Sequence, residues 1–109
     1  MANEKLRHKK FRIPKKVLVS LKHGYQRYQG PEKVEGYLRT QHLIGGKKIS
    51  YELLKKVKHF FDHYQGSEKS PVYHLNGGDT MRHWVNRTLA YARRLANKGK
   101  SSSLSLIHI

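Results

Sequence analysis

The segment ISYELLKKVKHFFDHY, residues 49–64, contains the clearest secondary-structure signal in the chain. Its apolar residues recur at helical spacing and form one broad face, a pattern that predicts an amphipathic helix. Ser50 is a residue type that caps helix N-termini, and Ile49 can pack on Leu54 as a hydrophobic staple. Because the apolar face is wide, we expect this helix at the centre of the core. The face comprises Leu53, Leu54, Val57, Phe60, Phe61 and Tyr64.

Helices are also predicted on the N-terminal side of this segment. The first begins at Pro14, which suits the first helical position, and ends at Gly30-Pro31. Its apolar stripe contains Val17, Leu18, Leu21, Tyr25 and Tyr28. A second helix is predicted from about Glu32 to Leu43, with Gly45-Gly46 supplying a left-handed C-terminal cap.

One helix is predicted on the C-terminal side, with Asp79 as its N-cap and an end at Asn97 to Gly99. The preceding connection, Gln65 to Gly78, contains one proline and three glycines and is predicted to be an ordered loop. Its apolar residues Val72, Tyr73 and Leu75 are expected to hold it against the core.

These elements predict an all-α fold, a small four-helix orthogonal bundle with a flexible basic N-terminal arm. The arm covers residues 1–13, the single helical domain residues 14–99, and a disordered tail residues 100–109. Residues 104–109 read like the translation of a sequencing adapter. We therefore exclude them from fold reasoning and expect the native C-terminus to be missing.

Composition narrows the classes of protein to which the chain can belong. It has 109 residues and no cysteine, which excludes disulfides and thiolate metal sites. No apolar run approaches the roughly 20 residues that span a bilayer, and residues 1–12 lack the apolar stretch of a secretory signal. We expect no membrane partner and a location inside a cell or in a particle made there.

Charge is the strongest functional indication. The chain carries 23 Lys and Arg against 7 Asp and Glu, a formal net charge of +16. Such an excess favours polyanions, of which nucleic acid is the commonest, and contact with phosphates gives little sequence discrimination. The predicted nucleic-acid-binding residues of the arm and first helix are Lys5, Arg7, Lys9, Lys10, Arg12, Lys15 and Lys16. Those of the folded patch are Arg82, Arg87, Arg93 and Arg94.

Enzymatic chemistry has little support in the sequence. His59 and His63 stand four apart in an H-x-x-D-H pattern that can bind a metal, but three lysines lie nearby and no third ligand is evident. Asn76-Gly77-Gly78-Asp79 precedes a helix without the lysine of a P-loop, so we interpret it as a capped turn. We predict no catalytic residue, no metal and no cofactor.

A helix-turn-helix regulator is an alternative. The segment from Tyr37 to Phe61 could place Gly45-Gly46 in the turn and use the helix after Ser50 for recognition. The residues that would then face the groove are Tyr51, Lys55, Lys56 and His59. Against this, the connection is longer than the usual three or four residues.

Two stretches resemble small uncharacterised basic proteins of tailed phages and environmental viral genomes. They are residues 49–62 and Leu75 to Asp79 with the following Met81, Trp84, Val85 and Leu89, together covering the second half of the chain. The resemblance implies no activity. It adds a further hypothesis, a structural or adaptor protein of a phage particle that binds an acidic protein partner. The oligomeric state stays open.

Overall fold

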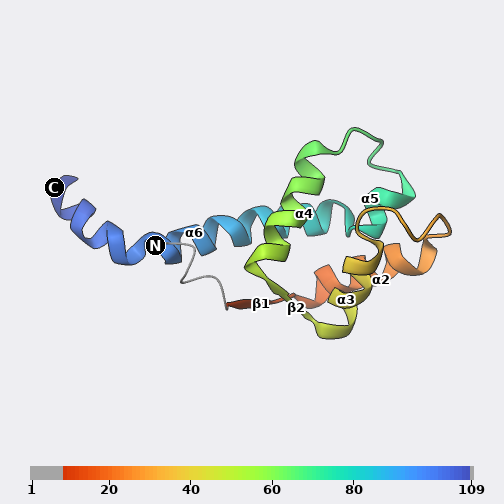
Figure 1. Ribbon diagram of the computed structural model, residues 1–109, viewed down its shortest axis with the longest axis horizontal. Coiled ribbons are helices and arrows are strands. Elements are labelled where there is room, and N and C mark those ends of the chain that lie inside the picture. The colour runs from red at the N-terminus through yellow and green to blue at the C-terminus, as the bar shows by residue number, and fades with distance from the viewer. Residues whose placement is uncertain (1–8, 109) are drawn as a thin grey trace.

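The computed structural model describes the backbone of residues 9–108 and the side chains of residues 9–96. Within this part of the chain, five helices accompany one two-stranded antiparallel sheet (Figure 1). The predicted, mainly helical fold is therefore confirmed, but the observed structure has one helix more than the predicted four and a sheet that the prediction lacks. None of the described helices is both long and apolar enough to cross a bilayer.

The sheet is a two-stranded ribbon, and its two short strands are distant in sequence. Strand β1 (Lys10–Arg12) pairs with β2 (Lys48–Ser50), and the Ile13 N–H donates to the Lys47 carbonyl at 3.0 Å. The side chains of Phe11 and Ile13 are buried in the core. This corrects the predicted arm, because residues 10–13 belong to the folded domain. The remainder of the arm, residues 1–8 with Lys5 and Arg7, lies outside the described residues.

Helix α2 (Lys15–Arg27) follows the ribbon and has the expected apolar stripe, with Val17 and Leu21 fully buried. Helix α3 (Tyr37–Gly46) begins five residues later than predicted, because residues 32–36 form turns and Gly36 has a φ of 96°. The predicted glycine cap is also wrong. Lys47, with a φ of 60°, takes the left-handed position after α3.

Helix α4 (Tyr51–His63) confirms the central prediction. The Ser50 hydroxyl oxygen accepts the Leu53 N–H at 3.2 Å, which caps the helix as expected. Leu54 and Val57 are fully buried, and the rings of Phe60 and Phe61 pack edge to face, 5.1 Å apart. The helix crosses in front of α6 in Figure 1 and packs against it.

The connection after α4 contains a short helix, α5 (Pro71–Leu75), whose residues Tyr73 and Leu75 are buried as predicted. Helix α6 then runs from Gly78 to His108, past the predicted end at Asn97 to Gly99. Asp79 is not the N-cap, since it lies in the first turn and its carboxylate accepts a hydrogen bond from the Tyr73 hydroxyl.

The core forms where α2, α4 and α6 meet. α2 packs on α3, α5 and α6, whereas the ribbon packs on α3 and α4 through β2. Met81, Val85, Leu89 and Ala92 give α6 its buried face, as its sequence pattern predicts. The fold therefore leaves the outer faces of the ribbon, α2 and α6 available for function.

A buried asparagine ties α3 to the α5–α6 connection. The Asn76 side chain is 2% exposed; its amide nitrogen donates to the carbonyls of Glu35 (3.1 Å) and Val72 (3.0 Å), and its amide oxygen accepts from Arg39 at 2.8 Å. A Cβ at Gly36 would overlap this side chain. Burial lowers the pKa of Arg39 from its ordinary value, an effect that Glu35 opposes.

Candidate nucleic-acid interface

The two-stranded ribbon has one apolar face and one cationic face. Residues that are opposite in an antiparallel pair share a face, and consecutive residues alternate between faces. Phe11 lies opposite Ile49, and both are buried. Arg12 lies opposite Lys48 on the other face, together with Lys10, and all three are exposed. The ribbon therefore carries three cations to the surface while its apolar pair anchors it to the core.

Like charges stand directly across this ribbon. Arg12 and Lys48 are register partners, and two cations in that position destabilise a strand pair. The ion pairs between described side chains join Arg39 to Glu35, Lys55 to Glu52, Lys58 to Asp62 and Arg82 to Asp79. None of them neutralises the ribbon. The cationic face is thus an unfavourable arrangement for the isolated protein, and a bound anion would relieve it.

Four further lysines flank the ribbon in sequence. Lys9 precedes β1, and its ammonium lies 5.5 Å from the Phe11 ring centroid. Lys15 and Lys16 open α2, which has no acidic residue in its first turn and no side-chain cap from Pro14. Cations at a helix N-terminus oppose the helix dipole, so these positions also favour an anion. The fourth is Lys47, the left-handed residue that leads into β2. All four side chains are exposed.

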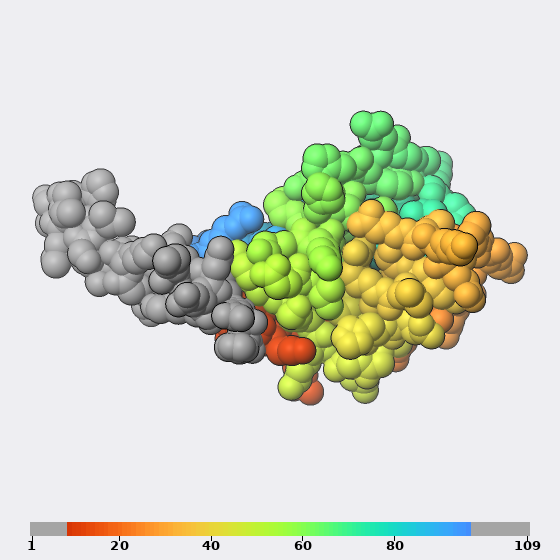
Figure 2. Space-filling view, viewed as in Figure 1, coloured from red at the N-terminus to blue at the C-terminus, as the bar shows by residue number. Residues whose placement is uncertain are grey.

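We define the ribbon surface as these cations: Lys9, Lys10, Arg12, Lys15, Lys16, Lys47 and Lys48. Five of them belong to the arm and first helix singled out by the sequence. Lys47 and Lys48 were missed, although alternation of polar and apolar residues in Lys10-Phe11-Arg12 and Lys48-Ile49-Ser50 is a weak sign of half-buried strands. In Figure 2 the start of the described chain (red) reaches the surface at the lower edge of the molecule.

The predicted arginines of α6 do not form one cluster. Arg82 is half-buried and lies 3.8 Å from the Asp79 carboxylate. Arg87, Arg93 and Arg94 are exposed. Helical spacing places Arg87 and Arg94 on one side of the helix and Arg82 and Arg93 on another, with about 18 Å of helix between Arg82 and Arg94. We therefore treat these arginines as separate secondary contacts.

The two histidines of α4 lie together on an exposed surface. The ring centroids of His59 and His63 are 4.2 Å apart, and the Asp62 carboxylate between them in sequence pairs with Lys58 at 3.2 Å. Within the part of the chain that the structure describes, no group of three potential metal ligands comes together. This geometry offers two ligands, fewer than a structural or catalytic zinc site requires.

The α3–β2–α4 segment contains the residues of the helix-turn-helix alternative. The predicted long connection is wrong, because only residues 47–50 separate α3 from α4. Three of these four residues form strand β2, and Tyr51 is 6% exposed. The ammonium of Lys55 lies 4.9 Å from the Tyr51 ring centroid and 3.1 Å from Glu52. Lys56 and His59 are exposed. Of the four residues expected to face the groove, Tyr51 is thus buried and Lys55 is engaged within the helix, which leaves Lys56 and His59 for recognition.

Comparison of the chain with protein-family models, with curated proteins and with solved structures finds no match.

Proposed function

We propose that the protein binds nucleic acid through the phosphate backbone, with the ribbon surface as its principal contact. The binding needs no catalytic group and no cofactor, and it discriminates little between base sequences. The arginines of α6 and the N-terminal residues Lys5 and Arg7 add secondary phosphate contacts. The cell compartment that this function implies is the host cytoplasm or a virion that packages nucleic acid.

The observation that carries the proposal is the pairing of Arg12 with Lys48. Burial of the Phe11–Ile49 pair is compatible with any polar residues on the outer face of the ribbon. Cations nevertheless occupy both opposed positions there. Placing like charges opposite each other lowers the stability of the ribbon. Phosphates reverse the sign of this interaction, because each neutralises a cation and releases counterions from the nucleic acid.

Charge distribution along the chain supports the same surface. From Lys9 to Pro31 the sequence contains seven cations and no acidic residue, and five of these cations belong to the ribbon surface. Cations that are not interrupted by acids produce a positive potential, which attracts polyanions over about a Debye length. A surface of alternating charge would not do so.

Titration of a duplex DNA at several salt concentrations tests the proposal. If at least three phosphates are neutralised, a plot of log K against log salt concentration should have a slope of about −3 or steeper. Two duplexes of unrelated sequence should bind with the same affinity at each salt concentration. Affinity that hardly responds to salt would contradict phosphate-driven binding. Binding of an acidic protein in nuclease-treated material, without binding of DNA, would favour the adaptor hypothesis instead.

A further inference from the structure

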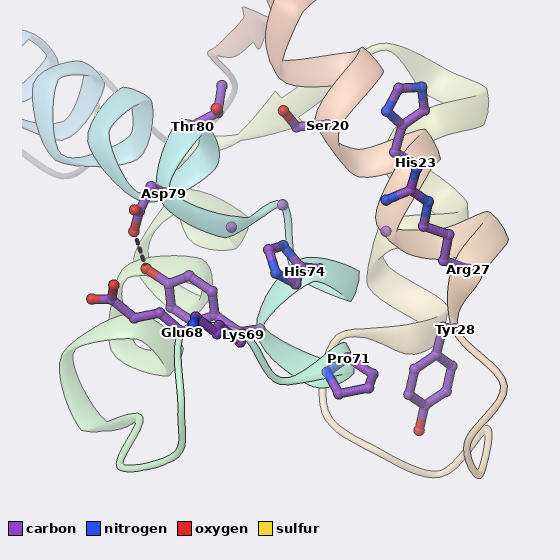
Figure 3. Close-up of a pocket in the computed structure, with 14 residues that line it drawn as sticks. Ser20, His23, Arg27, Tyr28, Glu68, Lys69, Pro71, His74, Asp79 and Thr80 are labelled. Atoms are coloured by element: carbon purple, nitrogen blue, oxygen red, sulfur yellow. Dashed lines mark hydrogen bonds between the residues drawn. The ribbon is translucent and has the colours of Figure 1, made fainter.

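A pocket of about 520 Å³ lies between the second half of α2, the short helix α5 and the start of α6 (Figure 3). Its volume falls within the range of small-molecule sites, about 300–1,000 Å³. The cations of the ribbon surface do not line it. The pocket is therefore a second feature, distinct from the surface proposed to bind the phosphate backbone.

Glycines bring the three helices close enough to form the pocket. A Cβ at Gly24 of α2 would overlap the carbonyl group of His74 on α5, so only glycine permits this approach. Gly77 and Gly78 have φ values of 101° and 59°, and they turn the chain from α5 into α6. All three glycines line the pocket, and part of its wall is therefore backbone.

Apart from Lys69, the charged side chains of the pocket are segregated. His23 and Arg27 lie on α2 along one side; Asp79 and Glu68 lie on the opposite side, where Lys69 adjoins Glu68, and His74 lies between the two sides (Figure 3). The Asp79 carboxylate already accepts a hydrogen bond from the Tyr73 hydroxyl and lies 3.8 Å from Arg82. Among the described side chains, none of the ion pairs involves Arg27. The α2 side is consequently the one that can accept an anion.

A polar stripe on α2 connects this pocket to the ribbon surface. Lys16, Ser20, His23 and Arg27 are separated by four, three and four residues, which places them on one side of the helix. Eleven residues of helix span about 16 Å. Ser20, His23 and Arg27 line the pocket, whereas Lys16 belongs to the ribbon surface. A strand held at the ribbon could thus follow α2 to the pocket.

We propose that the pocket binds a phosphorylated nucleoside, with the phosphate beside Arg27 and His23. A nucleotide matches the segregated charges, because it is an anion at one end and carries hydrogen-bond donors of its base and sugar at the other. Those donors face the carboxylates of Asp79 and Glu68.

Two sources can supply this ligand, a free nucleotide or the phosphorylated end of a bound strand. The second source rests on the proposed function, since it requires a strand at the ribbon surface. The first does not. Separate measurements with free nucleotides and with oligonucleotides therefore distinguish a failure of this inference from a failure of the proposed function.

Isothermal titration calorimetry of the full chain with each of the four nucleoside 5′-monophosphates, and with the four unphosphorylated nucleosides, tests the free ligand. Oligonucleotides of one sequence with a 5′-phosphate, a 3′-phosphate or no terminal phosphate test the strand end. In either series, the phosphorylated ligand should bind about 10-fold more tightly than its unphosphorylated counterpart, which corresponds to one charge-assisted contact.

Arg27→Gln should abolish most of this preference, whereas Lys22→Gln should preserve it. Lys22 is a matched control because it is an exposed cation on the same helix, outside the pocket. His23→Glu, which puts a carboxylate beside the phosphate position, should abolish the preference more completely than Gln26→Glu. Equal binding with and without the phosphate in both series overturns the inference, as does an equal effect of the Arg27 and Lys22 substitutions. If neither series shows a phosphate preference but the oligonucleotides bind with a steep salt dependence, only the ribbon proposal stands.

Discussion

Arg12 on β1 and Lys48 on β2 are opposed in the antiparallel register, and both side chains are exposed. The buried pair beside them, Phe11 and Ile49, holds the ribbon on the core, so the ribbon does not depend on favourable contacts between its outer side chains. Repulsion across the outer face and attraction to a polyanion therefore arise from the same two residues. Substitutions at these positions should change stability and binding in opposite directions.

Lys48→Glu converts the opposed like charges into an opposite-charge pair. We expect the free energy of unfolding to rise by about a few tenths of a kcal/mol, while affinity for duplex DNA falls. The double substitution Arg12→Gln with Lys48→Gln should make the salt slope less steep by about 2. Urea denaturation and fluorescence anisotropy measure the two effects.

The control for these variants is Lys33→Gln with Lys56→Gln, which removes two exposed cations away from the ribbon. It should change the salt slope much less. If both double variants weaken binding equally, net charge rather than the ribbon surface determines affinity.

Gly24→Ala should destabilise the protein, because the added methyl group would overlap the His74 carbonyl where α2 and α5 meet. Overpacking of this kind costs about 1–3 kcal/mol of unfolding free energy. Gly45→Ala in α3 is the matched substitution, since nothing lies within 4 Å of the new Cβ. There we expect stabilisation by up to about 1 kcal/mol from helix propensity. Thermal or urea denaturation should give opposite signs, and equal signs would contradict the close α2–α5 contact.

Asn76→Ala should lower the free energy of unfolding by about 1–3 kcal/mol. The substitution removes the partner of Arg39 and the side-chain donor to the Glu35 carbonyl, whereas the Val72 carbonyl keeps the backbone N–H of residue 76. Asn86→Ala provides the comparison, because Asn86 is exposed and accepts one hydrogen bond, from Lys58. Its effect should stay within about 0.5 kcal/mol. A comparably small effect at Asn76 would show that the α3–α5 connection does not depend on this amide.

Alkaline conditions should weaken the contribution of Tyr73 to the free energy of unfolding. Burial, followed by the hydrogen bond to Asp79, raises its pKa from 10.0 to about 12. Since the folded-state pKa is the higher one, the unfolded chain loses this proton first as pH rises. The stabilisation is therefore fully present below about pH 10 and is lost between pH 10 and 12.

Comparison of the wild type with Tyr73→Phe measures this contribution. The difference in unfolding free energy between the two should decrease across that pH interval, because the phenylalanine variant has no phenol to titrate. A Tyr73 difference that does not change with pH would contradict burial of the neutral phenol.

Local signals predicted the longer helices and their inward faces. Ser50 caps α4, Val17 and Leu21 line α2, and Leu89 lies on the buried face of α6. Each of these features depends on residues a few positions apart, so hydrophobic period and capping chemistry suffice to predict it. The predicted position of α3 was wrong, because Gly36 and the Asn76 hydrogen bonds, contributed from 40 residues along the chain, determine where the helix begins.

The site was predicted only in part for the same reason. The sequence indicated Lys10 and Arg12 from their charge, but it assigned them to a flexible arm. Lys48 was not indicated, and neither was a pocket beside His23 and Arg27. Three-residue strands are too short for a period of two to stand out, and a pocket between α2, α5 and α6 depends on how closely Gly24 lets the helices approach.

By itself, the sequence determined the excess of 16 positive charges, the helical majority and the apolar faces that build the core. These are properties of composition and of residues that lie close together in the sequence. Only the tertiary structure decided that Arg12 stands opposite Lys48 and that a pocket forms beside Arg27. Such relationships join segments that are far apart in the chain. They are determined by hydrogen bonding between strands and by the packing of helix against helix, which exist only once the core has formed.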